Sequence, residues 1–104
     1  MKNLVLIVHA GLKQATADLL RSLDDVEEFT FTDVEGHGNQ DDYPDLSNRD
    51  KVVGYVPRLR VDIILDDSKV DSVLAVFQEK REGGKSNGKQ NIYWVLDIHK
   101  NGEF

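Results

Sequence analysis

The chain has 104 residues and carries 19 acidic against 13 basic side chains, a formal net charge of −6. This length predicts one domain spanning residues 1–104. The negative balance argues against a nucleic-acid binder, which needs a basic surface to displace counterions from phosphates. No apolar run approaches the roughly 20 residues of a membrane span. The absence of cysteine excludes disulfides and thiol chemistry. We therefore expect a cytoplasmic protein with no membrane insertion.

The first part of the chain predicts a strand, a helix and a second strand. Residues 4–8 are continuously apolar and rich in β-branched side chains, which is typical of a central strand covered on both faces. Residues 29–32 alternate and begin a strand that we expect to end near Gly36. Between these strands, residues 12–23 show helical spacing of apolar side chains. The apolar positions of this helix are Leu12, Ala15, Leu19, Leu20 and Leu23.

A long segment without periodicity follows the second strand. Residues 36–56 include Pro44 and lack the sustained hydrophobic spacing of a helix or strand. A loop of this length inside a compact domain is uncommon and is usually functional or disordered. We place this loop at about residues 38–57.

The remainder predicts a strand, a helix and a final strand. Residues 59–65 alternate between apolar and charged side chains, as in a strand with two different faces. Asp67 or Ser68 is expected to cap the next helix. Residues 82–89 form a glycine-rich loop, and residues 92–98 alternate in the last strand. The buried stripe predicted for the helix is Val70, Val73, Leu74 and Phe77.

This order of elements predicts an α+β fold, the ferredoxin-like βαββαβ sandwich with a long loop between its second and third strands. Right-handed crossovers would place both helices on one face of the sheet. The apolar side chains left on the other face favour a partner, and we expect an oligomer. We expect that open face to carry Thr30, Thr32, Arg58, Arg60, Asp62, Ile64, Tyr93, Val95 and His99.

Two glycine-containing loops are candidates for ligand binding. Gly36 and Gly38 allow a ligand to approach the backbone closely, although a plain turn explains them as well. The loop up to Lys89 combines glycines with Lys80, Arg81 and Lys85, a pattern that suits an anion. A basic helix end that complements the helix dipole is the alternative explanation.

Three separated stretches together resemble the P-II signal-transduction family. Residues 32–40 resemble its T-x-V-x-G-x-G-x-Q motif at the start of the long T-loop, and residues 56–64 resemble the strand that leaves that loop. Residues 86–89 are similar to the family's G-D-G-K, with Ser86 and Asn87 in place of its first two residues. The ligand residues implied by this resemblance are Gly36, Gly38, Gln40, Arg58, Asp62, Gly88 and Lys89.

The resemblance implies homotrimers that bind ATP or ADP in clefts between subunits. It also implies that the loop of residues 38–57 docks on a membrane transporter or another protein. One departure concerns the last strand, where the family carries two phosphate-binding arginines and this chain has Asp97. An aspartate there repels phosphate, so the identity of the effector stays open.

The chain is also similar to a P-II-like branch found beside heavy-metal efflux pumps. The shared features are Gly36-His37-Gly38, Leu46-Ser47 and Tyr93-Trp94-Val95. This similarity implies a link to metal tolerance or to a transporter.

The three histidines raise the alternative of a divalent-metal site. We expect His9 at one end of the sheet and both His37 and His99 at the other. A trimer would then bring His37 of one subunit near His99 of the next, beside loop aspartates at positions 41, 42 and 45. Imidazole and carboxylate ligands suit zinc, copper or nickel. The alternative is that His37 is a turn residue and His99 an exposed strand residue.

No arrangement of catalytic residues appears in the sequence, so we expect a protein that is not an enzyme. Two functions remain. The first is a regulator that binds a small effector at subunit clefts and acts on a partner through its long loop. The second is a metal-binding protein linked to metal tolerance or efflux.

Overall fold

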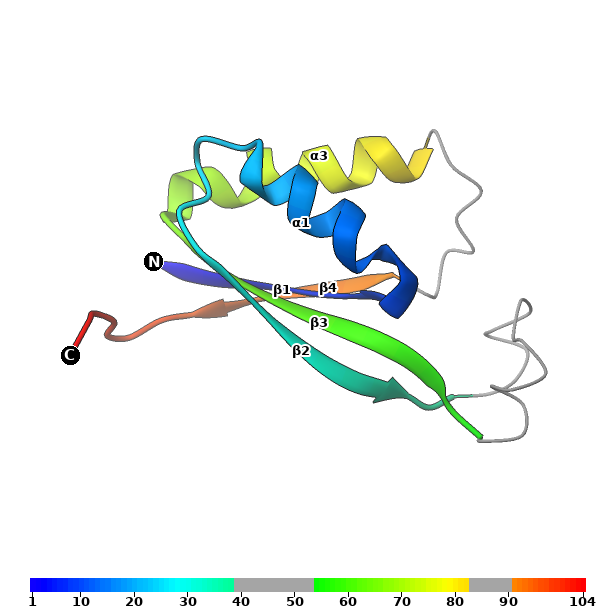
Figure 1. Ribbon diagram of the computed structural model, residues 1–104. Helices are drawn as coiled ribbons and strands as arrows, with labels where there is room; N and C mark the ends of the chain where they lie inside the picture. Colours follow the sequence, from blue (N-terminus) through cyan, green and yellow to red (C-terminus); the bar gives the residue numbers. More distant parts are fainter. Residues whose placement is uncertain (39–53, 83–90) are drawn as a thin grey trace.

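The computed structural model describes residues 1–38, 54–82 and 91–104. It confirms the predicted α+β, ferredoxin-like order, with two helices covering one face of a four-stranded antiparallel sheet (Figure 1). The strands are β1 (Lys2–His9), β2 (Phe29–Gly36), β3 (Val56–Leu65) and β4 (Ile92–Asp97). Their order in the sheet is β2-β3-β1-β4. The helices are α1 (Lys13–Arg21) and α3 (Val70–Glu82), preceded by the short 3-10 helices η1 (Ala10–Leu12) and η3 (Asp67–Lys69).

The core lies between the helices and the inner strands. β1 is central, as predicted, but the helices cover only one of its two faces. Leu4, Leu6 and Val8 lie in the core beneath the helices, whereas Val5 is buried on the opposite face and Ile7 there is half-buried. The predicted stripe of α3 is also confirmed, since all four members pack into or against the core. The core cluster comprises Leu4, Leu6, Val8, Leu20, Leu59, Val61, Ile63, Leu65, Val70 and Val73.

The prediction for α1 holds at Leu20, which lies in the core, and at Leu23, which packs against it, but differs at the start of the helix. Leu12 and Ala15 are exposed, whereas Thr16, Ala17 and Leu20 are buried. The reason is that Leu12 belongs to η1 and α1 begins only at the next residue. Within α1 the buried stripe therefore begins at Thr16, one residue after the predicted Ala15.

The cap of the second helical segment also differs from the prediction. The predicted caps were Asp67 and Ser68, but the N-cap of η3 is Asp66. Its carboxylate accepts hydrogen bonds from the backbone N–H of Ser68 at 3.1 Å and from the Ser68 hydroxyl at 2.6 Å. These bonds lower the pKa of Asp66, because they favour its ionised form.

The predicted face of β4 was wrong. Antiparallel residues directly opposite one another share a face, and Tyr93 pairs with Leu6 while Val95 pairs with Leu4. Both therefore lie on the side of the helices. Trp94 lies on the open face instead. The sequence could not assign these faces because both sides of β4 are apolar.

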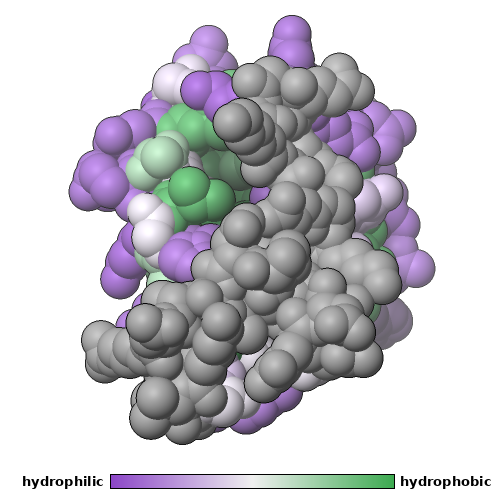
Figure 2. Space-filling model, turned by 90° about the vertical axis from the view of Figure 1, so that its right-hand side faces the viewer, coloured by the Kyte–Doolittle hydropathy of each residue, from purple (hydrophilic) through white to green (hydrophobic). Residues whose placement is uncertain are grey.

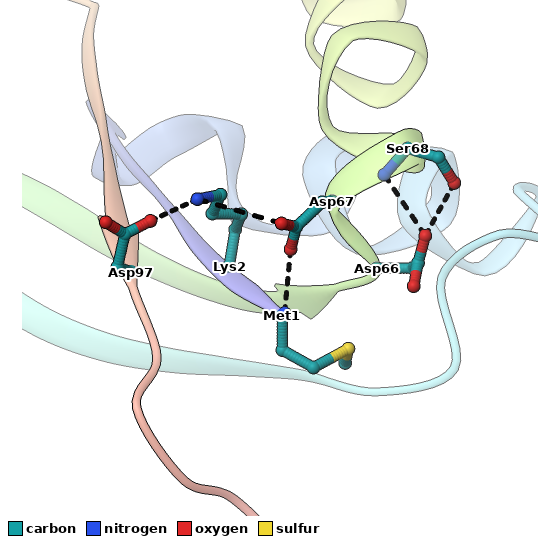
Figure 3. A network of polar contacts seen from close by, with 6 residues as sticks. All are labelled: Met1, Lys2, Asp66, Asp67, Ser68 and Asp97. Atoms are coloured by element: carbon teal, nitrogen blue, oxygen red, sulfur yellow. Dashed lines mark hydrogen bonds and ion pairs between the residues drawn. The ribbon is translucent and has the colours of Figure 1, made fainter.

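A network of charges holds together the end of the sheet at which β1 begins (Figure 3). The terminal ammonium of Met1 lies 2.7 Å from the Asp67 carboxylate. Lys2 pairs with Asp67 at 3.8 Å and also with Asp97, at the end of β4. The pKa of Asp67 is lowered, first by its bond to the terminal ammonium, and that of Lys2 is raised, first by its bond to Asp97. The network thus ties η3, β1 and β4 together.

We expect this network to lose its stabilising effect in acid. The folded-state pKa of Asp67 lies below its ordinary value of 3.8, so the unfolded chain takes up the proton first as the pH falls. The contribution is present above that value and disappears as the pH drops through the folded-state pKa. Asp67→Asn should therefore make the free energy of unfolding less dependent on pH below about 4.

Urea unfolding at a series of pH values measures this difference. Asp71→Asn, in the first turn of α3, removes one carboxylate without touching the network and serves as the control. Equal pH slopes for the wild type and Asp67→Asn would contradict the prediction.

Candidate functional site

Two ends of the sheet must be distinguished. The His9 end is where β1 and β2 end and β3 begins: Gly36 pairs with Val56, and His9 pairs with Arg58. The Met1 end is the opposite one, where β1 begins and β4 ends. β2 ends and β3 begins at the His9 end (Figure 1). Seen from that side, the described surface shows a hydrophobic patch flanked by hydrophilic residues (Figure 2).

Arg58 is a buried cation at the His9 end. The residue is only 3% exposed. One of its guanidinium nitrogens, Nη2, donates a hydrogen bond to the backbone oxygen of Ile7 at 3.2 Å. Buried arginines are rare unless their donors are satisfied, so the bond to β1 fixes the direction of the guanidinium. This places a positive charge beside the point where β2 and β3 leave the sheet.

Gly36 makes room for that arginine. A Cβ atom at position 36 would lie 2.6 Å from Arg58 Cγ and 3.1 Å from Arg58 Cδ. Real side chains do not approach this closely, so only glycine is compatible with the observed position of Arg58. The structure thus brings together two residues of the predicted ligand site, Gly36 and Arg58.

Asp62 lies elsewhere on the same strand. It is four residues from Arg58, about 13 Å along β3. Its carboxylate receives two hydrogen bonds from Arg60, both at 3.0 Å, and one from the Asn3 side chain at 3.2 Å. The bonds from Arg60 lower the pKa of Asp62 and outweigh the opposing effect of burial. Within one chain, the structure therefore does not bring Asp62 to the His9 end.

His37 lies just beyond β2 and contacts two residues that the sequence reasoning missed. Its Nε2 lies 3.0 Å from the Glu35 carboxylate, and its ring centroid lies 5.9 Å from that of Tyr55. The alternation of a strand could have indicated the first contact, because residues two apart share a face. The pair is exposed and can exchange its mutual contact for a ligand.

The predicted placement of the histidines was wrong. His9 accepts a hydrogen bond from the Gly11 N–H at 3.0 Å through Nδ1 and lies at the same end of the sheet as His37. His99 follows β4 and lies at the Met1 end. The reason is strand direction: β1 and β2 both run antiparallel to β3, whereas β4 runs antiparallel to β1. One chain therefore holds His37 and His99 beyond opposite ends of β1, a strand about 23 Å long.

Other predicted residues complete this description. Gly38 is exposed and directly precedes the 39–53 segment. Gln40, Gly88 and Lys89 lie outside the described residues. Within residues 1–38, 54–82 and 91–104, no group of three or more histidines and acids is arranged to hold a metal ion. In the same ranges, neither helix is long and apolar enough to cross a membrane.

These features define a ferredoxin-like α+β domain in which a long segment joins neighbouring antiparallel strands, with a buried arginine where that segment leaves the sheet. The chain belongs to the P-II family, because residues 1–100 match the family described as nitrogen regulatory protein P-II. This match confirms the resemblance inferred from the sequence, and P-II proteins are regulatory proteins.

Individual relatives agree with this assignment. A nitrogen regulatory protein P-II from Pasteurella multocida (strain Pm70) is 30% identical over 82 residues, covering 75% of this chain and 73% of its own. A DUF3240 family protein from Shewanella baltica OS155 has a similar structure, with a TM-score of 0.73 at 18% identity. CPII, a nitrogen regulatory PII-like protein from Thiomonas intermedia K12, gives a TM-score of 0.67 at 19% identity. Each of these two structural matches covers 99% of this chain and 94% of the other.

Proposed function

We propose that this chain is a non-catalytic, cytoplasmic regulator that binds a small anionic effector, an adenine nucleotide, at the His9 end of its sheet. The effector would lie in a cleft between subunits of a homotrimer. Its binding would shift the population of conformations of the 38–57 segment, and so the docking of that segment on a membrane transporter or another protein.

The observation that carries this proposal is the buried Arg58 beside Gly36. A guanidinium recognises phosphate oxygens through paired hydrogen bonds, and burial strengthens such contacts by excluding water. The backbone at Gly36 has no side chain that would keep a ligand away. Both residues lie where the 38–57 segment joins the sheet, so a bound anion would be in a position to act on that segment.

A relative supports the chemical class of the effector. The structure of CPII contains ADP, AMP and bicarbonate. All three are anions, in agreement with a cationic site. From the sequence, Asp97 is expected to repel phosphate. In the structure Asp97 is paired with Lys2 at the Met1 end of the same chain. Its charge is thus partly neutralised within the subunit.

We expect calorimetric titration with ADP and with ATP to detect saturable binding. Arg58→Met keeps the apolar stem of the side chain but removes its charged donors. Because hydrogen bonds to charged groups contribute about 1.5–3 kcal/mol, this substitution should weaken binding about 10- to 100-fold. Arg58→Lys, which retains the charge without the planar fork, should lose less.

Arg21→Met is the matched control, since it removes an exposed arginine from the end of α1. It should bind like the wild type. If the wild-type protein binds neither nucleotide, the effector class is wrong. If Arg21→Met and Arg58→Met bind equally well, Arg58 is not part of the site. Thermal unfolding of each variant shows whether it is folded.

A divalent metal is the second candidate, and the contact between Glu35 and His37 favours it. A carboxylate and an imidazole in contact at the end of a strand can chelate zinc or copper, with further ligands from solvent or another subunit. The same titration repeated with zinc tests this function. His37→Ala should abolish zinc binding, whereas His99→Ala, at the other end of the sheet, should not. Retention of zinc binding by His37→Ala would exclude this site.

A further inference from the structure

The open face of the sheet, opposite the helices, is mainly apolar on β1 and β4. Strand register places Asn3, Val5 and Ile7 of β1 on this face, beside the even-numbered residues of β3 and β4. Three large apolar residues of the face are 42–49% exposed. They are Ile64, Ile92 and Leu96. Exposed apolar side chains gathered on one sheet face indicate a surface that is covered by a partner.

A polar network lies inside this apolar surface. The Arg60 guanidinium bonds the Asp62 carboxylate through two nitrogens, each at 3.0 Å, and the Asn3 carboxamide donates to the same carboxylate at 3.2 Å. Arg60 also stacks over the Trp94 ring, 5.7 Å from its centroid. The paired bonds and the stacking hold the guanidinium in one orientation. The network is therefore a rigid polar group within an otherwise apolar surface.

One atom of this network lacks a hydrogen bond, and this lowers the stability of the isolated chain. The side-chain oxygen of Asn3 is buried and has no hydrogen-bond partner among the described residues. A buried acceptor without a donor costs about 1–3 kcal/mol. The same side chain also donates a hydrogen bond to Asp62, so this cost falls on its oxygen alone. That oxygen contributes nothing to the stability of the single chain and is available to accept a hydrogen bond from a partner.

Charge indicates which partner covers the face. The chain has a net charge of −6, so most of its surfaces would repel a second copy. On the open face the described charged residues are Arg58, Arg60 and Asp62, and the last two neutralise each other. A second copy of this chain can therefore pack here without bringing acidic surfaces together.

We propose that Asn3, Arg60 and Asp62 specify the register of self-association across the open face, and through it the number of subunits. This inference rests on the assembly that we propose for the function. An apolar surface alone permits several sliding arrangements of similar energy. When the face is buried, the Asn3 oxygen must find a donor in the second copy, so the arrangements that supply one beside the Arg60–Asp62 pair are favoured over the others.

Multi-angle light scattering tests this inference on the full chain. The wild type should give one species at three times the chain mass of 11.8 kDa. The variant Asn3→Leu/Arg60→Met/Asp62→Leu should still associate, but as a mixture of sizes. Asp62→Asn, which leaves Arg60 without its carboxylate, should weaken association about tenfold. Asp33→Asn removes an acid from the other face of β2 and should change neither property.

The outcomes separate the two proposals. A uniform trimer of the triple variant would overturn the inference and leave the proposed assembly intact. A monomeric wild type would overturn both. If the triple variant does not fold, Asn3→Leu alone serves, and it should yield mixed sizes. A uniform trimer of Asn3→Leu would then overturn the inference.

Discussion

Replacing Leu20 with alanine is expected to lower the free energy of unfolding by about 2–5 kcal/mol. Leu20 is fully buried and is the residue of α1 that belongs to the core cluster on the sheet. Truncation removes apolar contacts with the strands and leaves a cavity that the rigid sheet cannot fill. The loss should be large because few other α1 side chains are available to hold the helix in place.

Urea unfolding at a fixed protein concentration measures this loss, since self-association would otherwise shift the midpoint. Leu12→Ala is the matched control. Leu12 lies in η1, immediately before the same helix, but is 42% exposed, and its truncation should change stability by no more than about 0.5 kcal/mol. Equal losses for the two variants would show that α1 does not contribute to the core through Leu20.

Gly36→Ala is expected to destabilise the fold by about 1–3 kcal/mol and to displace Arg58. The added Cβ would lie 2.6 Å from Arg58 Cγ and 3.3 Å from the Val56 oxygen. Cγ is close to the backbone of β3, and the residue is buried, so the clash cannot be relieved by moving the tip of the side chain. Either the strands separate locally or Arg58 loses its bond to Ile7.

Thermal unfolding together with nucleotide titration measures both consequences. The effector affinity of Gly36→Ala should fall as in Arg58→Met, although the arginine itself is retained. Gly102→Ala is the control, because a Cβ there would meet no atom within 4 Å. An unchanged melting temperature for Gly36→Ala would contradict the close packing of Gly36 on Arg58.

Several elements of the fold could be predicted because they depend on strong local patterns. The apolar run of β1 indicates a central strand, and the alternation in β3 separates its buried and open faces unambiguously. These two strands, with the order of the helices, are sufficient for the sheet topology. The Gly36 motif also marked a real structural constraint, although its contact is with Arg58.

Other features depend on partners that are distant in the sequence. The face of β4 is decided by its pairing with β1, because Ile92, Tyr93, Val95 and Leu96 are all apolar. The ends at which His37 and His99 lie follow from strand direction, which the predicted antiparallel topology already implied, so their expected placement was an error of inference. The contact between Asn3 and Asp62 joins residues 59 positions apart.

The amino-acid sequence by itself determined the fold class, the family and the central strand, because hydrophobic periodicity and motif spacing are local properties of the chain. Only the tertiary structure decided that Gly36 and Arg58 are in contact, that Asp62 pairs with Arg60 and Asn3, and which face of the sheet each residue of β4 occupies. The physical reason is that strand register and direction are fixed by hydrogen bonding between strands, and this brings together residues with no local relation in the sequence.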